Sequence, residues 1–78
     1  MVEDSEFLKK VLLLALFNRD KTTSIQEVLV ELDVVNAISM NDSKELLKEI
    51  KADKLLIDGN FTDLGKSKVD EAQKFFEI

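Results

Sequence analysis

The chain lacks the residues on which much protein chemistry depends. Its 78 residues include no cysteine and no histidine, which excludes disulfides, thiol chemistry, the usual zinc ligand and the commonest general base, so no serine has a histidine to activate it. Proline, tryptophan and tyrosine are also absent, and the two glycines are Gly59 and Gly65, which excludes a glycine-rich phosphate loop. We therefore expect no enzymatic activity, no catalytic residue, no metal site and no cofactor.

Long apolar runs are scarce as well. The longest, Val11 to Phe17, has seven residues, far fewer than the roughly 18 that suggest a membrane-spanning helix. Three of the first six residues are acidic, which is not typical of a signal peptide. Hydrophobic residues make up 45% of the chain and charged residues 35%, a balance typical of a folded soluble domain. We expect one domain over residues 1–78, in the cytoplasm, without a membrane partner or a small-molecule substrate.

Strong helix breakers are almost absent before the two glycines, so helix should dominate the first part of the chain. Asp4 or Ser5 can cap a first helix that runs to about Asn18, with apolar residues at helical spacing along it. Leu13 and Phe17 widen its apolar arc. Such a helix should be buried on more than one side.

Two capping patterns predict the next two helices. Ser24 followed by Glu27 has the spacing of a capping box, which satisfies two backbone donors at a helix start. The run Asp42-Ser43-Lys44-Glu45 repeats this pattern and predicts a third helix that continues to about Lys54. Residues 33–41 lie between them and predict a long, apolar connection, in which an extra helical turn can pack on the core.

The sequence also predicts a β-hairpin and a fourth helix. Apolar residues flank Gly59-Asn60, and these two residues tolerate the positive φ that a two-residue hairpin turn requires. Thr22-Thr23 is a candidate third strand beside the hairpin. Thr62 or Asp63 can cap a final helix. The predicted fold is mainly α with a small β-hairpin (α+β), in the order α-α-α-β-β-α.

The segment from Phe61 to Lys66 resembles the phrase (Leu/Ile)-Thr-x-x-Gly-(Arg/Lys) that ends the wing of many small bacterial and phage winged-helix proteins. From Phe7 onward, the order of elements resembles the winged helix-turn-helix superfamily as a small stand-alone domain. In that superfamily the third helix usually enters the major groove of DNA, and the wing touches the backbone or the minor groove. The resemblance implies DNA contacts at Asn41, Lys44, Glu45, Lys48, Lys51, Asn60, Lys66 and Lys68.

The charge pattern bears on that expectation. A net charge of −5 has the wrong sign for a general nucleic-acid binder, so DNA binding requires the basic residues to gather on one surface. On a helical wheel the third helix carries three lysines on one flank and three acids on the other: Lys44, Lys48 and Lys51, and Glu45, Glu49 and Asp53. The lysine flank can follow a phosphate backbone, or both flanks can match a charged protein partner. A third interpretation is a solvated face on which Glu45 reaches Lys48.

Apolar residues near the two ends of the chain give a second candidate surface. Winged-helix regulators of the kind that this chain resembles commonly dimerise through their terminal helices, and a homodimer would bury the excess apolar surface. We expect the dimer or partner surface at Leu13, Phe17, Phe75, Phe76 and Ile78. The alternative is that Phe75, Phe76 and Ile78 close the monomer core against the first helix.

Two functions follow from these patterns. The first is a homodimeric, DNA-binding transcriptional regulator, with the lysines on the DNA backbone and with Asn41 and Glu45 at base edges. The second is a winged-helix module for protein interaction that does not bind DNA. The acidic charge, the acidic flank and a hairpin turn without arginine favour the second function. The usual role of the superfamily favours the first.

Overall fold

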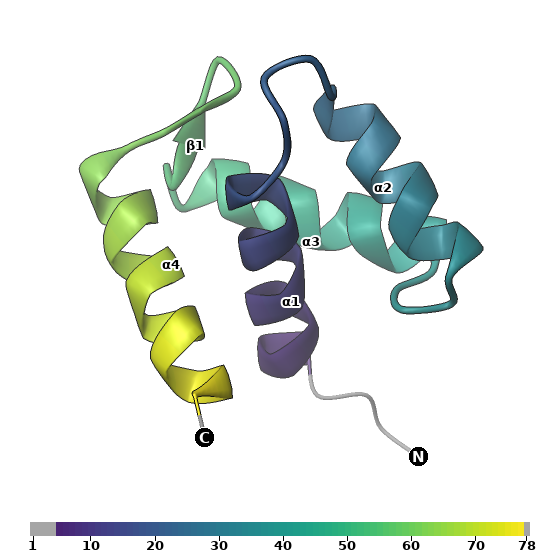
Figure 1. Cartoon of the computed structure of the whole chain (residues 1–78). Coiled ribbons are helices and arrows are strands. Elements are labelled where there is room, and N and C mark those ends of the chain that lie inside the picture. Colours follow the sequence, from purple (N-terminus) through teal and green to yellow (C-terminus); the bar gives the residue numbers. More distant parts are fainter. Residues whose placement is uncertain (1–4, 78) are drawn as a thin grey trace.

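The computed structural model describes residues 5–77 and is mainly helical, with one small sheet (Figure 1). The elements are α1 (Ser5–Phe17), α2 (Ile25–Val34), α3 (Met40–Ala52), β1 (Leu56–Ile57), β2 (Asn60–Phe61) and α4 (Asp63–Phe76). The predicted class and the order α-α-α-β-β-α are confirmed. In this part of the chain no helix has both the length and the apolar character needed to cross a bilayer.

Helix α1 is the central element of the fold. In Figure 1 it lies in front of α3, between α4 and α2, and it contacts all three helices. Its wide apolar arc explains this position, because Leu13 is buried together with the stripe of Leu8, Leu12 and Leu16. The rest of the apolar core comes from the other three helices, from the loop before α3 and from the start of the hairpin: Val28, Leu29, Ile38, Leu46, Ile50, Leu55, Leu56 and Val69.

The capping box at the start of α2 is confirmed. The Ser24 hydroxyl accepts a hydrogen bond from the Glu27 backbone N–H at 3.1 Å, and the Glu27 carboxylate accepts one from the Ser24 N–H at 3.3 Å. These two bonds satisfy backbone donors that the helix itself cannot pair. They fix the point at which the loop between α1 and α2 ends.

Helix α3 begins earlier than the sequence pattern predicts. Its N-cap is Ser39, whose hydroxyl accepts a hydrogen bond from the Asp42 N–H at 3.2 Å. The prediction of a cap at Asp42 and Ser43 is therefore wrong. Ser39 offers the same three-residue capping geometry one turn earlier, and Ser43 lies fully buried inside the helix.

The connection between α2 and α3 is also shorter than predicted. It spans residues 35–39, because both helices extend into the segment that the sequence assigns to a loop. Asn36 adopts a positive φ of 60°, and the Ala37 N–H bonds to the Leu32 carbonyl at 2.9 Å. Asparagine tolerates this left-handed conformation and ends α2 as a glycine commonly does. Ile38 then turns into the core.

The hairpin is confirmed, but its turn lies one residue earlier than predicted. Leu56 pairs with Phe61 and Ile57 with Asn60, so the turn residues are Asp58 and Gly59. Their φ values are 52° and 81°, as a type I′ turn requires, and Asp-Gly is a favoured pair for it. Asn60 is a strand residue. The candidate strand at Thr22-Thr23 is not formed, since the sheet within residues 5–77 has only β1 and β2.

Thr62 and Gly65 join α4 to the chain that enters the hairpin. The Thr62 hydroxyl caps α4 by accepting from the Gly65 N–H at 3.0 Å, and it donates to the Lys54 carbonyl at 2.7 Å. A Cβ atom on Gly65 would lie 2.9 Å from the carbonyl carbon of Leu55 and 3.0 Å from the Phe61 ring. The threonine and the glycine of the Phe61 to Lys66 phrase therefore have structural roles.

Candidate functional site

Helix α3 buries one side and exposes the rest. Ser43, Leu46 and Ile50 face the core. The residues of α3 that the sequence predicts as contacts are all exposed: Asn41, Lys44, Glu45, Lys48 and Lys51. The helix therefore offers both of its charged flanks to other groups.

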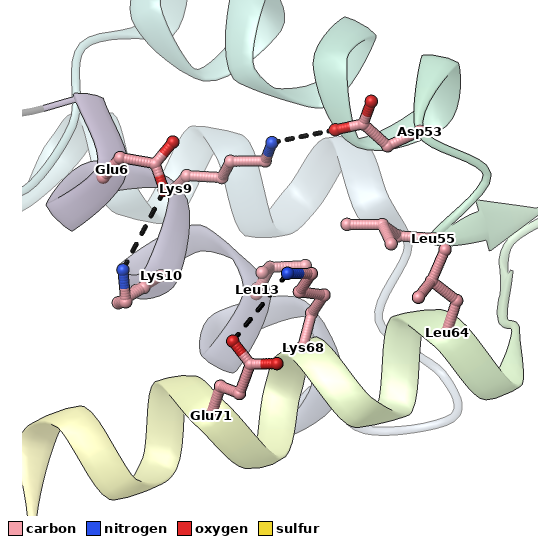
Figure 2. A pocket seen from close by; sticks show the side chains of 9 residues that line it. All are labelled: Glu6, Lys9, Lys10, Leu13, Asp53, Leu55, Leu64, Lys68 and Glu71. Atoms are coloured by element: carbon pink, nitrogen blue, oxygen red, sulfur yellow. Dashed lines mark hydrogen bonds and ion pairs between the residues drawn. The ribbon is translucent and has the colours of Figure 1, made fainter.

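The acidic flank of α3 is tied to α1. The Lys9 ammonium lies 3.0 Å from the Asp53 carboxylate (Figure 2) and 3.9 Å from the Glu49 carboxylate. The Lys9 side chain is only 16% exposed, so its charge is committed to these two acids. Two of the three acids of this flank, Glu49 and Asp53, thus have the same cation of α1 beside them.

The lysine flank of α3 is left open. Lys44 and Lys51 make no ion pair within residues 5–77. Lys48 lies 4.0 Å from Glu45, with both side chains about three quarters exposed (77% and 74%). Exposed pairs of this kind contribute little free energy, so Lys48 can leave Glu45 for another anion.

The two charged flanks lie on different sides of α3. Figure 1 shows the hairpin and the loop between α1 and α2 at one end of the molecule, and the start of α1 and the end of α4 at the other. Lys9 lies in the first half of α1 and pairs with the acidic flank of α3. At 3.6 residues per turn the three lysines lie roughly 130° around the helix from the acids, on the flank that Lys9 does not contact.

Arg19, the only arginine of the chain, fixes the hairpin to the loop after α1. Its guanidinium donates to the Thr23 carbonyl at 3.1 Å, to the Gly59 carbonyl at 3.1 Å and to the Leu16 carbonyl at 3.4 Å. This arginine is not among the residues that the sequence patterns predict as functional. A basic side chain just after an apolar helix, where the last carbonyls lack partners, is the signal that could have found it.

A hollow of about 350 Å³ lies beside the hairpin and α1. Its lining includes Arg19, Lys21, Asn60 and Lys66, together with the single acid Asp20. Two of the predicted wing contacts, Asn60 and Lys66, therefore lie together in a mainly basic setting. Arg19 is committed to backbone carbonyls, which leaves Lys21 and Lys66 as the exposed cations here.

Lys68 does not belong to this surface. It lies 3.8 Å from the Glu71 carboxylate and lines a groove between α1 and α4 (Figure 2). Lys10 in the same groove lies 4.0 Å from Glu6, and Lys9 pairs with Asp53. Each of the three cations around this groove thus has an acid beside it.

The predicted partner surface is divided by the structure. Leu13 is 3% exposed and forms part of the core, so its assignment to a partner surface is corrected: its position on α1 faces α4 and not solvent. Phe17 packs edge to face on Phe61 of the hairpin, with ring centroids 5.6 Å apart. Ile78 lies outside the described residues.

Phe75 and Phe76 form an aromatic cluster with Phe7 at the other end of α1. The ring centroids of Phe7 are 6.2 Å from Phe75 and 5.4 Å from Phe76, and the Lys10 ammonium lies 5.0 Å from the Phe75 ring. Phe75 remains 56% exposed and Phe76 36% exposed. The two residues therefore pack on the first helix and still present apolar surface to solvent.

We compared the chain with protein-family models, with curated proteins and with solved structures, and nothing matches it. The candidate site therefore rests on the residues and the geometry described above. These are the open lysine flank of α3, the basic hollow beside the hairpin, and the aromatic cluster of Phe7, Phe75 and Phe76.

Proposed function

We propose that this chain is a small, non-enzymatic winged-helix protein of the cytoplasm that binds double-stranded DNA and regulates transcription. In this proposal α3 is the recognition helix and the hairpin is the wing. The observation that carries the proposal is the separation of charge on α3. Lys9 holds Glu49 and Asp53 on one flank, while Lys44, Lys48 and Lys51 stay open on the other.

The lysines and the neighbouring polar residues have separate tasks in this proposal. Lys44, Lys48 and Lys51 contact backbone phosphates, which supply most of the affinity and no sequence information. Asn41 near the start of α3 suits adenine, because an amide can both donate to and accept from that base. Glu45 can accept a hydrogen bond from the amino group of cytosine.

The hairpin contributes through the hollow beside it. Its turn carries Asp58 and no basic residue, so the tip does not suit the minor groove. Lys66 and Asn60 lie at the side of the hairpin and can approach the DNA backbone there. The three carbonyl contacts of Arg19 hold the hairpin in place, which limits the entropy lost on binding.

The test is a titration of isotopically labelled protein with random-sequence duplex DNA at low salt. We expect amide shifts confined to residues 41–51 and 59–66. With about three or four phosphates neutralised, the logarithm of the affinity should fall with the logarithm of salt concentration with a slope of about −3. A silent spectrum from a folded sample would exclude this mode and favour a module for protein interaction.

A matched pair of variants tests the docking face. Lys48→Glu should lower the DNA affinity at least about tenfold at low salt, because it replaces a phosphate contact with a repulsive charge. Lys74→Glu makes the same charge change on α4, at a side chain of similar exposure (71% against 77%), and should change the affinity less than about twofold. Equal losses in the two variants would contradict docking through α3.

We further propose that the protein acts as a homodimer through the aromatic cluster of Phe7, Phe75 and Phe76. The exposed parts of Phe75 and Phe76 at the end of α4 support this, because covering such apolar surface with a second copy removes it from water and stabilises the dimer.

Phe75→Asp tests the dimer and should give a folded monomer by light scattering. Leu64→Asp, at a residue of similar exposure near the start of α4, should stay dimeric. A folded Phe75→Asp protein that remains a dimer would rule out this surface.

A further inference from the structure

Helix α2 has a solvent face that the proposed function does not use. Its core face includes Val28 and Leu29, which are buried. On the opposite side Val30 and Val34 lie one turn apart, and Val35 follows directly after the helix. Val34 is 73% exposed and Val35 is 68% exposed. A short apolar stripe therefore runs along the outside of α2 to its C-terminal end.

Acidic residues border this stripe. Glu27, Glu31 and Asp33 are exposed, and α2 contains no basic residue. Glu31 and Asp33 make no ion pair within residues 5–77. A hollow of about 400 Å³ beside Val30 is lined by Thr23, Gln26, Glu27 and Glu31. The outer face of α2 thus combines apolar surface with the negative charge of Glu31 and Asp33, for which the described residues supply no ion-pair partner.

The stability of α2 does not explain these residues. Valine lowers helix propensity, because its branched side chain loses rotamers in a helix, and at solvent positions it gains no core packing in return. Glu31 and Asp33 lie toward the C-terminal end of α2, which has no basic residue in its last turn and where the helix dipole disfavours negative charge. Both features cost stability in the isolated chain, so a bound partner accounts for them better.

We propose that the outer face of α2 binds a basic amphipathic helix of another protein. Apolar residues of that helix lie along Val30, Val34 and Val35, and its lysines or arginines pair with Glu27, Glu31 and Asp33. Charge complementarity sets the class of partner and the direction of approach. The ten residues of α2 span roughly 15 Å, which matches about three turns of a partner helix.

A second copy of this chain fits the face less well. Another copy offers two basic surfaces. The hollow beside the hairpin has two exposed cations, Lys21 and Lys66, for the three acids of α2. On the lysine flank of α3, Lys44, Lys48 and Lys51 have no apolar residue between them on the exposed side. That flank supplies charge without an apolar stripe to cover the valines. A nucleic acid is excluded for this face, because its phosphates would meet Glu27, Glu31 and Asp33.

The experiment uses a synthetic 18-residue peptide of leucine and lysine only, with the leucines along one helical face. We follow the amide shifts of the labelled full chain at low salt and repeat the titration with the matched leucine and glutamate peptide. The lysine peptide should shift residues 25–35, and the glutamate peptide should shift none. Shifts spread over the acids of all four helices, or no binding at millimolar peptide, would overturn the proposal.

Two pairs of variants test whether the lysine peptide binds the outer face of α2 specifically or is attracted to the acidic protein as a whole. Glu31→Lys should weaken binding of the lysine peptide about tenfold, whereas Asp70→Lys, with the same charge change on α4, should weaken it less than about twofold. Val34→Ser should weaken it about fivefold, and Leu64→Ser should have almost no effect. Equal losses within either pair would overturn the proposal. A third outcome is that the amide signals of α2 and α3 shift when the protein concentration alone is raised, without peptide. That result would assign the face to a second copy of the chain and would also overturn the proposal.

Discussion

The Lys9 ammonium of α1 lies 3.0 Å from the Asp53 carboxylate that follows α3, and 3.9 Å from Glu49 one turn earlier. One cation on the central helix therefore pairs with two acids of the acidic flank of α3. The lysines of α3 lie on its other flank. The protein is acidic overall, with a net charge of −5, yet among the described residues the lysine flank makes one ion pair, the exposed contact of Lys48 with Glu45.

Lys9→Met tests whether the pairing of Lys9 with Glu49 and Asp53 matters for DNA binding. Lys9 lies away from the proposed DNA face, so we expect a modest loss of affinity, roughly twofold to fivefold at low salt, as Glu49 and Asp53 lose their cation. Fluorescence anisotropy with labelled duplex DNA measures it. The double variant Lys9→Met with Asp53→Asn should recover most of the loss. Because the two acids are more than half exposed, stability should change by less than about 1 kcal/mol.

Gly65→Ala should lower the free energy of unfolding by at least about 1 kcal/mol, as measured by urea unfolding. The new Cβ would lie 2.9 Å from the carbonyl carbon of Leu55, and backbone there cannot move aside without disturbing the hairpin. The sign of the stability change tests the contact, because alanine at an exposed helix position stabilises a protein by about 1 kcal/mol relative to glycine. A gain in stability would show that α4 does not approach the Leu55 backbone closely.

Arg19→Lys should loosen the hairpin. A lysine ammonium cannot reach three separate carbonyls as the planar guanidinium does, so we expect a loss of about 1–2 kcal/mol in the free energy of unfolding. Amide hydrogen exchange should become faster near the Asp58-Gly59 turn. Lys21→Ala, at an exposed residue of the same loop, serves as the control. Unchanged exchange in Arg19→Lys would mean that the turn is held by the sheet alone.

Ser43→Ala should stabilise the protein by about 1 kcal/mol. The Ser43 hydroxyl is fully buried and has no hydrogen-bond partner within residues 5–77, so its removal relieves a desolvation cost. Ser67→Ala, at an exposed residue of α4, measures the gain from helix propensity alone. A smaller gain at Ser43 than at Ser67 would imply that the buried hydroxyl is satisfied in solution.

Local signals in the sequence predict the order of elements well and their boundaries less well. The capping box of Ser24 and Glu27, and the threonine cap of α4, act within one helical turn, so the sequence shows them directly. Where two local signals compete, tertiary packing decides between them. Ser39 caps α3 in place of Asp42 because the earlier start lets the apolar side chain of Ile38 turn inward. The Asp58-Gly59 turn prevails because it lets Asn60 pair with Ile57.

The same distinction holds for the candidate site: local patterns predict its lysines, whereas long-range packing determines its other contacts. The lysine stripe follows from helical periodicity alone, and the lysines are exposed as the pattern predicts. The contacts of Lys9 with Asp53 and of Arg19 with Gly59 link residues 44 and 40 positions apart, so no local pattern can reveal them. The burial of Leu13 has the same cause, because it depends on where α4 packs against α1.

The packing of α1 against α4 also sets the order in which the fold can be completed during synthesis. Helix α1 emerges from the ribosome first and α4 last, yet the two helices and the aromatic cluster at their ends cover one another. Until α4 has emerged, the side of α1 that includes Leu13 has no helix to cover it. The nascent domain therefore carries one uncovered apolar side of α1 until α4 has emerged, and the last step of its folding waits for α4.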